Sequence, residues 1–204
     1  VGSEMCIRDR LVSGPKMKSL KIILSSIALI ASMQVFAEQA FSNQLLTQAQ
    51  NGDTTAQLDL AEAYLYGNGI QRDTEQAEVW GIKSAENGNP KAMFWLAEGY
   101  TFYALFNQKN DKKDVLDNYQ KAFKWYSKAS ALKHTDSMVE LANLYTLKES
   151  GIEQNINKAF QLRQEAATLG NKQAMQDLAL MYQKGVGVKQ NKRLAQSWLN
   201  KSKK

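Results

Sequence analysis

The side chains able to do acid–base, nucleophilic or metal chemistry are few in this chain of 204 residues. Its single cysteine is Cys6 and its single histidine is His134. A Ser/His or Cys/His nucleophile needs a base within reach, and a zinc site needs several Cys or His ligands. The sequence therefore predicts no catalytic residue and no metal, and we interpret His134 as a turn residue.

Carboxylates offer a second route to chemistry, because Asp59 and Glu62, like Glu75 and Glu78, stand three residues apart. That spacing places both members of a pair on one helical face. General acid–base catalysis also needs partner groups in a cleft, which nothing in the pattern indicates, so we favour a solvated surface. The glycine-rich stretches 67–69 and 185–187 lack the lysine and the preceding strand of a phosphate loop. We expect no cofactor and no enzymatic activity.

The elements that position these residues repeat four times. Each repeat opens with a passage that has a small first residue, Leu-Ala at its fifth and sixth positions and tyrosine at its ninth; the passages begin at Ala56, Ala92, Ser137 and Ala174. A second helix follows, marked by Ala77, Ala122, Ala159 and Ala195. The tyrosine and that alanine are separated by 13, 22, 14 and 13 residues. Repeat two therefore carries an insertion of about nine residues between Thr101 and Asn118.

Capping residues mark where these helices begin. Asp and Asn side chains accept hydrogen bonds from unpaired first-turn amides, and we expect this role for Asp53, Asp73, Asn89, Asn118, Asn155, Asn171 and Asn191. His134 occupies the same position in repeat three, where Thr135 is the alternative cap. Glycines between the helices favour the positive φ that ends a helix. Repeat two lacks such a turn.

The pattern A-x-x-x-L-A-x-x-Y, a G-x-G-[IV] turn, A-x-x-W and a closing Gly88 or Gly170, at a period near 36, resembles the Sel1-like repeat family over about residues 50–203. The resemblance implies an all-α, right-handed solenoid of antiparallel helix pairs, related to tetratricopeptide repeats, that acts as a protein-binding scaffold or adaptor. We expect repeats at 53–88, 89–133, 134–170 and 171–204 within a domain of residues 38–204. The departures are the insertion, Leu162 in place of Trp, and Lys133 in place of glycine.

The first 37 residues are predicted to lie outside this domain. Residues 1–16 have no apolar periodicity and resemble a translated sequencing-adapter remnant, so we interpret them as a non-native leader. Residues 17–37 read as a signal peptide with cleavage after Ala37, because the apolar stretch 22–33 is shorter than the about 20 residues of a membrane span. We expect a periplasmic or secreted bacterial protein without stable membrane insertion. The alternative is an uncleaved anchor.

Charge divides the domain. Residues 38–100 hold three basic and nine acidic side chains, whereas residues 101–204 hold eighteen and nine. Such a charge dipole permits weak head-to-tail self-association. The lysines of the basic half lie in the insertion, on a helix face and in the tail rather than in a stripe with stacking aromatics, so nucleic acid is not the expected partner.

The first helices supply the candidate binding face, since in this family they line the concave side. Positions 3, 6 and 10 after each small first residue fall near one face. From them we select as partner-binding candidates Asp59, Glu62, Tyr66, Trp95, Glu98, Phe102, Glu140, Asn143 and Asp177. Aromatic residues among acids are typical of a binding hot spot. The alternative interpretation is that Trp95, Phe102, Tyr103 and Phe106 pack under the inserted loop.

The sequence therefore favours a periplasmic scaffold that binds another protein on this face. On that hypothesis, changing Trp95 to Ala together with Glu98 to Lys weakens partner capture while the melting temperature stays nearly unchanged. Two other classes stay open. One is an immunity or inhibitor protein that neutralises a periplasm-directed toxin, and the other is a cell-wall or β-lactam hydrolase.

Overall fold

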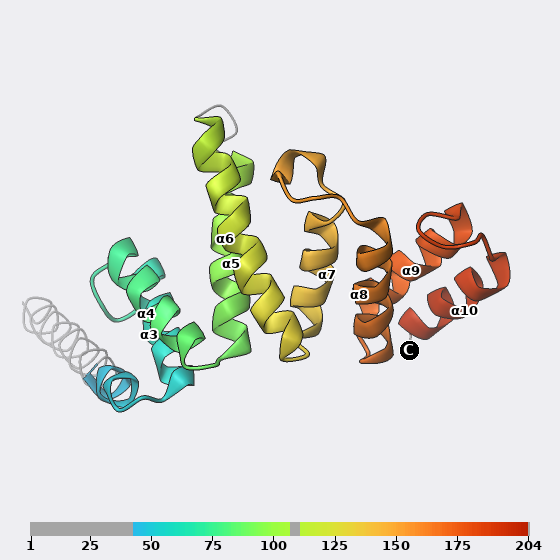
Figure 1. Cartoon of the computed structure of the whole chain (residues 1–204). Coiled ribbons are helices and arrows are strands. Elements are labelled where there is room, and N and C mark those ends of the chain that lie inside the picture. Colours follow the sequence, from blue (N-terminus) through green and yellow to red (C-terminus); the bar gives the residue numbers. More distant parts are fainter. Residues whose placement is uncertain (1–42, 107–110, 204) are drawn as a thin grey trace, which may run out of the picture.

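A row of helical hairpins makes up the computed structural model, which describes residues 43–106 and 111–203 (Figure 1). The four hairpins are α3 (Thr54–Tyr66) with α4 (Thr74–Glu86), α5 (Pro90–Phe106) with α6 (Lys112–Ala131), α7 (Thr135–Leu144) with α8 (Ile156–Thr168), and α9 (Lys172–Lys184) with α10 (Lys192–Ser202). A short 3₁₀ helix, η1 (Lys148–Ser150), lies between α7 and α8. The predicted all-α fold of four paired-helix repeats is confirmed. The expected leader, signal peptide and cleavage position lie outside the described residues.

Small residues let the helices of neighbouring pairs approach closely. The alanines that mark the first and second helices are buried, and so are the leucines one turn further along each first helix: Leu60, Leu96, Leu141 and Leu178. One continuous core runs from Leu58 and Ala85 of repeat one to Leu178 of repeat four, and a smaller cluster closes the N-terminal end. Each hairpin therefore buries its apolar face against its neighbours, as expected for a solenoid.

A further helical segment, residues 43–50, precedes the first repeat. Its Leu45 and Ala49 pack in the same cluster as Leu60 of α3. The buried Gln57 side chain donates from Nε2 to the carbonyl oxygen of Ala49 at 2.9 Å, which ties this segment to α3. The sequence pattern did not predict this segment, because it has no counterpart in the other repeats.

Most of the predicted N-caps are confirmed. Side-chain oxygens accept from first-turn amides at Asp53, Asp73, Asn89, Asn155, Asn171 and Asn191. In repeat three the cap is His134 itself rather than Thr135, since His134 Nδ1 accepts from the amide of Ser137 at 3.3 Å. The prediction that Asn118 is a cap is wrong. It lies inside α6, whose cap is Asp111.

The insertion of repeat two explains that error, because its described residues extend α5 as far as Phe106 and begin α6 at Lys112. Helix α5 has 17 residues and α6 has 20, against 13 in each of α3 and α4. At about 1.5 Å per residue, α6 extends roughly 10 Å further than α4. Figure 1 shows the α5–α6 hairpin standing beyond the helices on either side of it. One flank of this hairpin is therefore left beyond the reach of repeat one.

No helix in residues 43–106 or 111–203 is both long enough and apolar enough to cross a membrane.

Candidate functional site

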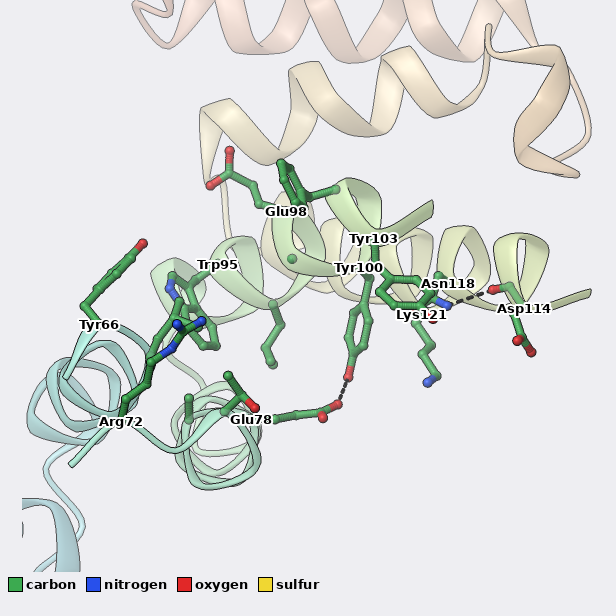
Figure 2. A pocket seen from close by; sticks show the side chains of 16 residues that line it. Tyr66, Arg72, Glu78, Trp95, Glu98, Tyr100, Tyr103, Asp114, Asn118 and Lys121 are labelled. Atoms are coloured by element: carbon green, nitrogen blue, oxygen red, sulfur yellow. Dashed lines mark hydrogen bonds between the residues drawn. The ribbon is translucent and has the colours of Figure 1, made fainter. Parts of the chain in front are cut away.

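A groove with a volume of about 1170 Å³ opens between the hairpin of repeat one and the longer hairpin of repeat two. Tyr66, at the end of α3, and Arg72, in the turn that follows, border it on one side (Figure 2). Glu78 of α4 lies below, and α5 and α6 form the opposite wall. The groove exists because α5 and α6 continue past the point where repeat one turns back.

Helix α5 presents one continuous stripe to this groove. Trp95, Glu98, Gly99 and Phe102 all line it, and their spacing of three and four residues places them on one helical face. Tyr66 is 66% exposed, Phe102 62% and Tyr103 44%. Large aromatic surfaces left in contact with water in a concave site are typical of places where another molecule binds.

Trp95 differs from the other aromatics of the stripe, because it also holds two helices together. It is partly buried against the core, and a Cβ atom added at Gly81 of α4 would lie 2.6 Å from its Cζ3. Replacing Trp95 with Ala therefore removes packing between α4 and α5. Because of this packing we now expect Trp95→Ala to lower the melting temperature, so Phe102 is the better probe of binding.

Phe102 and Phe106 stack on each other with ring centroids 4.2 Å apart, and both stay largely exposed. Tyr103 is exposed as well. Of the four aromatic residues that the alternative interpretation places under an inserted loop, Phe102, Tyr103 and Phe106 are therefore exposed in the described part of the chain, and only Trp95 is partly buried.

A polar cluster closes the far end of the groove. The Tyr100 hydroxyl donates to Glu78 Oε1 at 2.6 Å (Figure 2). Lys121 Nζ lies 5.1 Å from the centroid of the Tyr100 ring, a distance that allows a cation–π interaction. Burial, followed by the hydrogen bond from Tyr100 to Glu78, raises the pKa of Tyr100 above its usual range. This tyrosine therefore acts as a neutral hydrogen-bond donor at neutral pH.

Glu98 carries an unbalanced negative charge in the middle of the stripe. Burial raises the pKa of its carboxyl group, and the neighbouring carboxylates Glu140 and Asp136 add to the shift. No hydrogen bond or ion pair within residues 43–106 and 111–203 involves the Glu98 side chain. A cation from another molecule would offset the repulsion between these carboxylates.

The structure places the nine predicted binding residues in several different locations. Tyr66, Trp95, Glu98 and Phe102 meet in the groove. Glu140 and Asn143 instead line a smaller cavity of about 320 Å³ between α5, α6 and α7. Asp59 is exposed on α3 and Glu62 is partly buried there, and neither lines the groove.

Asp177 belongs to a structural link between repeats three and four. The buried Arg163 of α8 donates from Nη2 to Asn143 Oδ1 at 2.7 Å and from Nε to Asp177 Oδ2 at 3.2 Å. Asn143 in turn donates to Glu140 Oε2 at 3.2 Å. Asp177, one of the predicted partner-binding residues, therefore already has a cation partner within the protein.

Sequence reasoning missed Arg163, Gly99 and the polar end of the groove. Arg163 comes from a second helix, which the search of first helices did not include. A signal for Gly99 was present in the aligned repeats, where the same position holds Ala63, Leu144 and Met181.

Within the part of the chain that the structure describes, no three His, Cys, Asp or Glu side chains gather closely enough to hold a metal ion.

The four hairpins correspond to a known repeat. The family model described as Sel1 repeat matches residues 54–89, 90–134, 135–171 and 172–204. Among solved structures, a Sel1 repeat protein from Oxalobacter formigenes superposes with a TM-score of 0.68 at 22% sequence identity. That match covers 81% of this chain and 64% of the other, so this chain spans less than two thirds of that relative.

Two further solved structures are similar at lower scores. An immunity protein from Pseudomonas aeruginosa is 16% identical, with a TM-score of 0.44 over 83% of this chain and 81% of that one. A protective antigen from uropathogenic Escherichia coli is 21% identical, with a TM-score of 0.38 over 79% of this chain and 48% of that one. At these identities the likeness concerns the fold alone.

Proposed function

Because the chain belongs to the Sel1 repeat family, we propose that it is a periplasmic or secreted scaffold that holds another protein in the groove between repeats one and two. Sel1 repeats typically mediate protein binding. The observation that carries the proposal is the exposed stripe of α5, where Phe102 stands 62% exposed beside the unpaired carboxylate of Glu98. Aromatic anchors around a charge that lacks a partner are the composition of a binding hot spot.

The proposed scaffold carries out no catalysis. The titratable side chains that line the groove are three tyrosines, three carboxylates and two cations: Tyr66, Tyr100, Tyr103, Glu78, Glu98, Asp114, Arg72 and Lys121. Tyr100 is held protonated, and the set includes no nucleophile paired with a base, as acyl transfer would need. Binding is the role that this arrangement serves best.

Export rests on residues 17–37, which have the charge, apolar stretch and small residues of a signal peptide. Cell fractionation and N-terminal sequencing of the mature protein test it. We expect the protein in the periplasmic or secreted fraction with Glu38 as its first residue. Recovery in the membrane fraction with residues 17–37 still attached would contradict cleavage.

Site-specific photo-crosslinking tests the binding face. A photoreactive phenylalanine analogue replaces Phe102, whose exposure means that the change should alter stability by no more than about 0.5 kcal/mol. The matched control carries the analogue at Gln161, which is exposed on the second helix α8. Irradiation in the producing bacterium should give a discrete adduct with one other protein from position 102 and none from position 161.

A second pair of variants tests the charge at the same face. Glu98→Lys should reduce the adduct yield at position 102, whereas Glu149→Lys, a change of an exposed carboxylate within η1, should leave the yield unchanged. Equal yields from positions 102 and 161, or no adduct at all, would mean that the groove does not hold a partner.

A further inference from the structure

We propose that the occupant of the groove is a basic, partly apolar segment of the partner polypeptide, which packs its main chain or a small side chain directly against Gly99. This inference rests on the proposed function and adds the chemistry of the segment and its point of closest approach. Three features carry it: one glycine, one uncovered flank and the distribution of charge.

Gly99 lies inside helix α5, where glycine costs about 1 kcal/mol relative to alanine. The other glycine inside a described helix, Gly81, has an internal reason, because Trp95 occupies the space that its Cβ would need. Apart from its own helical backbone and its two chain neighbours, none of the described residues lies within 4 Å of a Cβ added at Gly99. The fold itself therefore does not require glycine at this position, whereas the close approach of another molecule would.

The aligned repeats show what normally stands here. Ala63, Leu144 and Met181 occupy the equivalent position in repeats one, three and four, and they are only 7%, 3% and 7% exposed. In repeat four, Met181 packs beneath the turn of its own hairpin, with its Cε 3.3 Å from a Cβ added at Gly187. In repeat two, helix α5 continues past Gly99 to Phe106, so no turn covers this position. A glycine stands where the other repeats have a buried side chain, and the space is open to the groove.

The two flanks of the α5–α6 hairpin also differ. On the α7 side, the protein itself covers the part of the hairpin that extends past its neighbours. The turn after η1 places Gly151 against Leu116 of α6, and a Cβ atom added at Gly151 would lie 2.7 Å from Leu116 Cδ2. On the α4 side, the turn of repeat one packs against its own residues, since the atoms that a Cβ added at Gly67 would meet most closely belong to Ile70 and Arg72. A partner segment on this side would cover the surface that the turn after η1 covers on the other.

Charge complementarity selects the kind of segment. The groove is lined by three carboxylates, Glu78, Glu98 and Asp114, and by two cations, Arg72 and Lys121. Glu78 accepts a hydrogen bond from Tyr100, whereas Glu98 is repelled by the nearby carboxylates Glu140 and Asp136. Neither of the two ion pairs among the described residues involves a residue of the groove. A lysine or arginine of the partner would meet Glu98, while its apolar neighbours cover Tyr66 and Phe102. A neutral or acidic segment would cover Glu98 and leave its carboxylate unpaired.

The test uses dodecapeptides selected from a random phage-displayed library on the wild-type protein, with binding then measured by fluorescence anisotropy. Gly99→Met introduces the residue of repeat four and blocks the groove surface at position 99, while Gly99→Ala introduces that of repeat one and leaves most of this surface accessible. Both changes remove a helical glycine and should preserve or raise the melting temperature.

Three results are expected together. The selected peptides should be enriched in Lys or Arg next to apolar residues. Gly99→Met should weaken their binding by about tenfold or more and Gly99→Ala by less than about threefold. Glu98→Lys should weaken it about tenfold, and the binding of wild-type protein should fall as salt is raised.

Other outcomes overturn the inference. Peptides enriched in acidic residues would contradict the basic character of the segment. Unchanged peptide binding to Gly99→Met would contradict the contact at Gly99. A wild-type dimer that Gly99→Met dissociates in sedimentation equilibrium would identify the occupant as a second copy of this chain. If the Phe102 adduct persists in Gly99→Met, the scaffold function stands and only this assignment fails. If no adduct forms in either protein, the scaffold function fails as well.

Discussion

A Cβ atom added at Gly81 would lie 2.6 Å from Cζ3 of Trp95 and 3.3 Å from Cδ2 of Leu96. Helix α4 therefore approaches α5 so closely that the indole ring covers bare backbone. This contact joins repeat one to repeat two directly beside the groove. Packing between the helices therefore requires glycine at position 81, whereas it does not require glycine at position 99 on the facing helix.

The first prediction compares these two glycines. Gly81→Ala should lower the free energy of unfolding by about 1 kcal/mol, because an overpacking cost of about 1–3 kcal/mol outweighs the gain in helix propensity. Gly99→Ala should raise it by up to about 1 kcal/mol, since its Cβ meets no other element. Urea denaturation of both variants measures the difference. Stabilisation by Gly81→Ala would mean that the contact with Trp95 is not tight.

The fold could be predicted because its signals are local and repeated. The buried Leu96 and Leu178 follow from a pattern that recurs four times, and caps such as Asp73 follow from side-chain chemistry within one turn. The error at Asn118 has the same origin. A pattern that fixes the offset between cap and alanine cannot tell whether inserted residues form a loop or continue a helix.

The candidate site was less predictable, because its properties depend on how neighbouring hairpins differ in length. Helical spacing placed Trp95, Glu98 and Phe102 on one face, and the structure places them together in the groove. The spacing could not show that Trp95 packs on α4 or that Arg163 reaches Asp177 from the next element. Contacts between different helices decide those roles.

The second prediction concerns Arg163, which joins Asn143 of α7 to Asp177 of α9. Arg163→Met keeps the aliphatic packing but removes the cation, so it should lower the free energy of unfolding by roughly 1–3 kcal/mol. In the background of Asp177→Asn the same change should cost less, because no unpaired carboxylate is left. Urea denaturation of the double-mutant cycle checks this. Strict additivity would mean that the ion pair contributes nothing.

The third prediction concerns Lys133, a non-glycine residue with a φ of 64° where Gly88 and Gly170 have φ values of 92° and 98°. Its side chain pairs with Glu165 on the surface, and such exposed pairs contribute little. Lys133→Gly should therefore be more stable than Lys133→Ala by about 1 kcal/mol, because both lose the pair and only glycine is unstrained at this φ. Thermal denaturation compares the two variants. Equal melting temperatures would show that the left-handed conformation carries no strain.

The last prediction concerns pH. His134 caps α7 through Nδ1, and its pKa is lowered from 6.5, chiefly by burial and further by Lys91, against an opposing effect of Asp136. Below pH 6.5 the unfolded chain therefore binds more protons than the folded one, so stability present above pH 6.5 is lost as the pH falls through the folded-state pKa.

The pH variant is His134→Asn, which keeps a cap of the kind seen at Asn171 but does not titrate. Between pH 8 and 5.5 the wild-type free energy of unfolding should fall more steeply than that of His134→Asn, because a protonated Nδ1 can no longer accept from the amide of Ser137. Chemical denaturation at intervals across this range gives both curves. Parallel curves would show that the cap does not titrate with His134, and a wild-type protein that gains stability in acid would reverse the sign of the linkage.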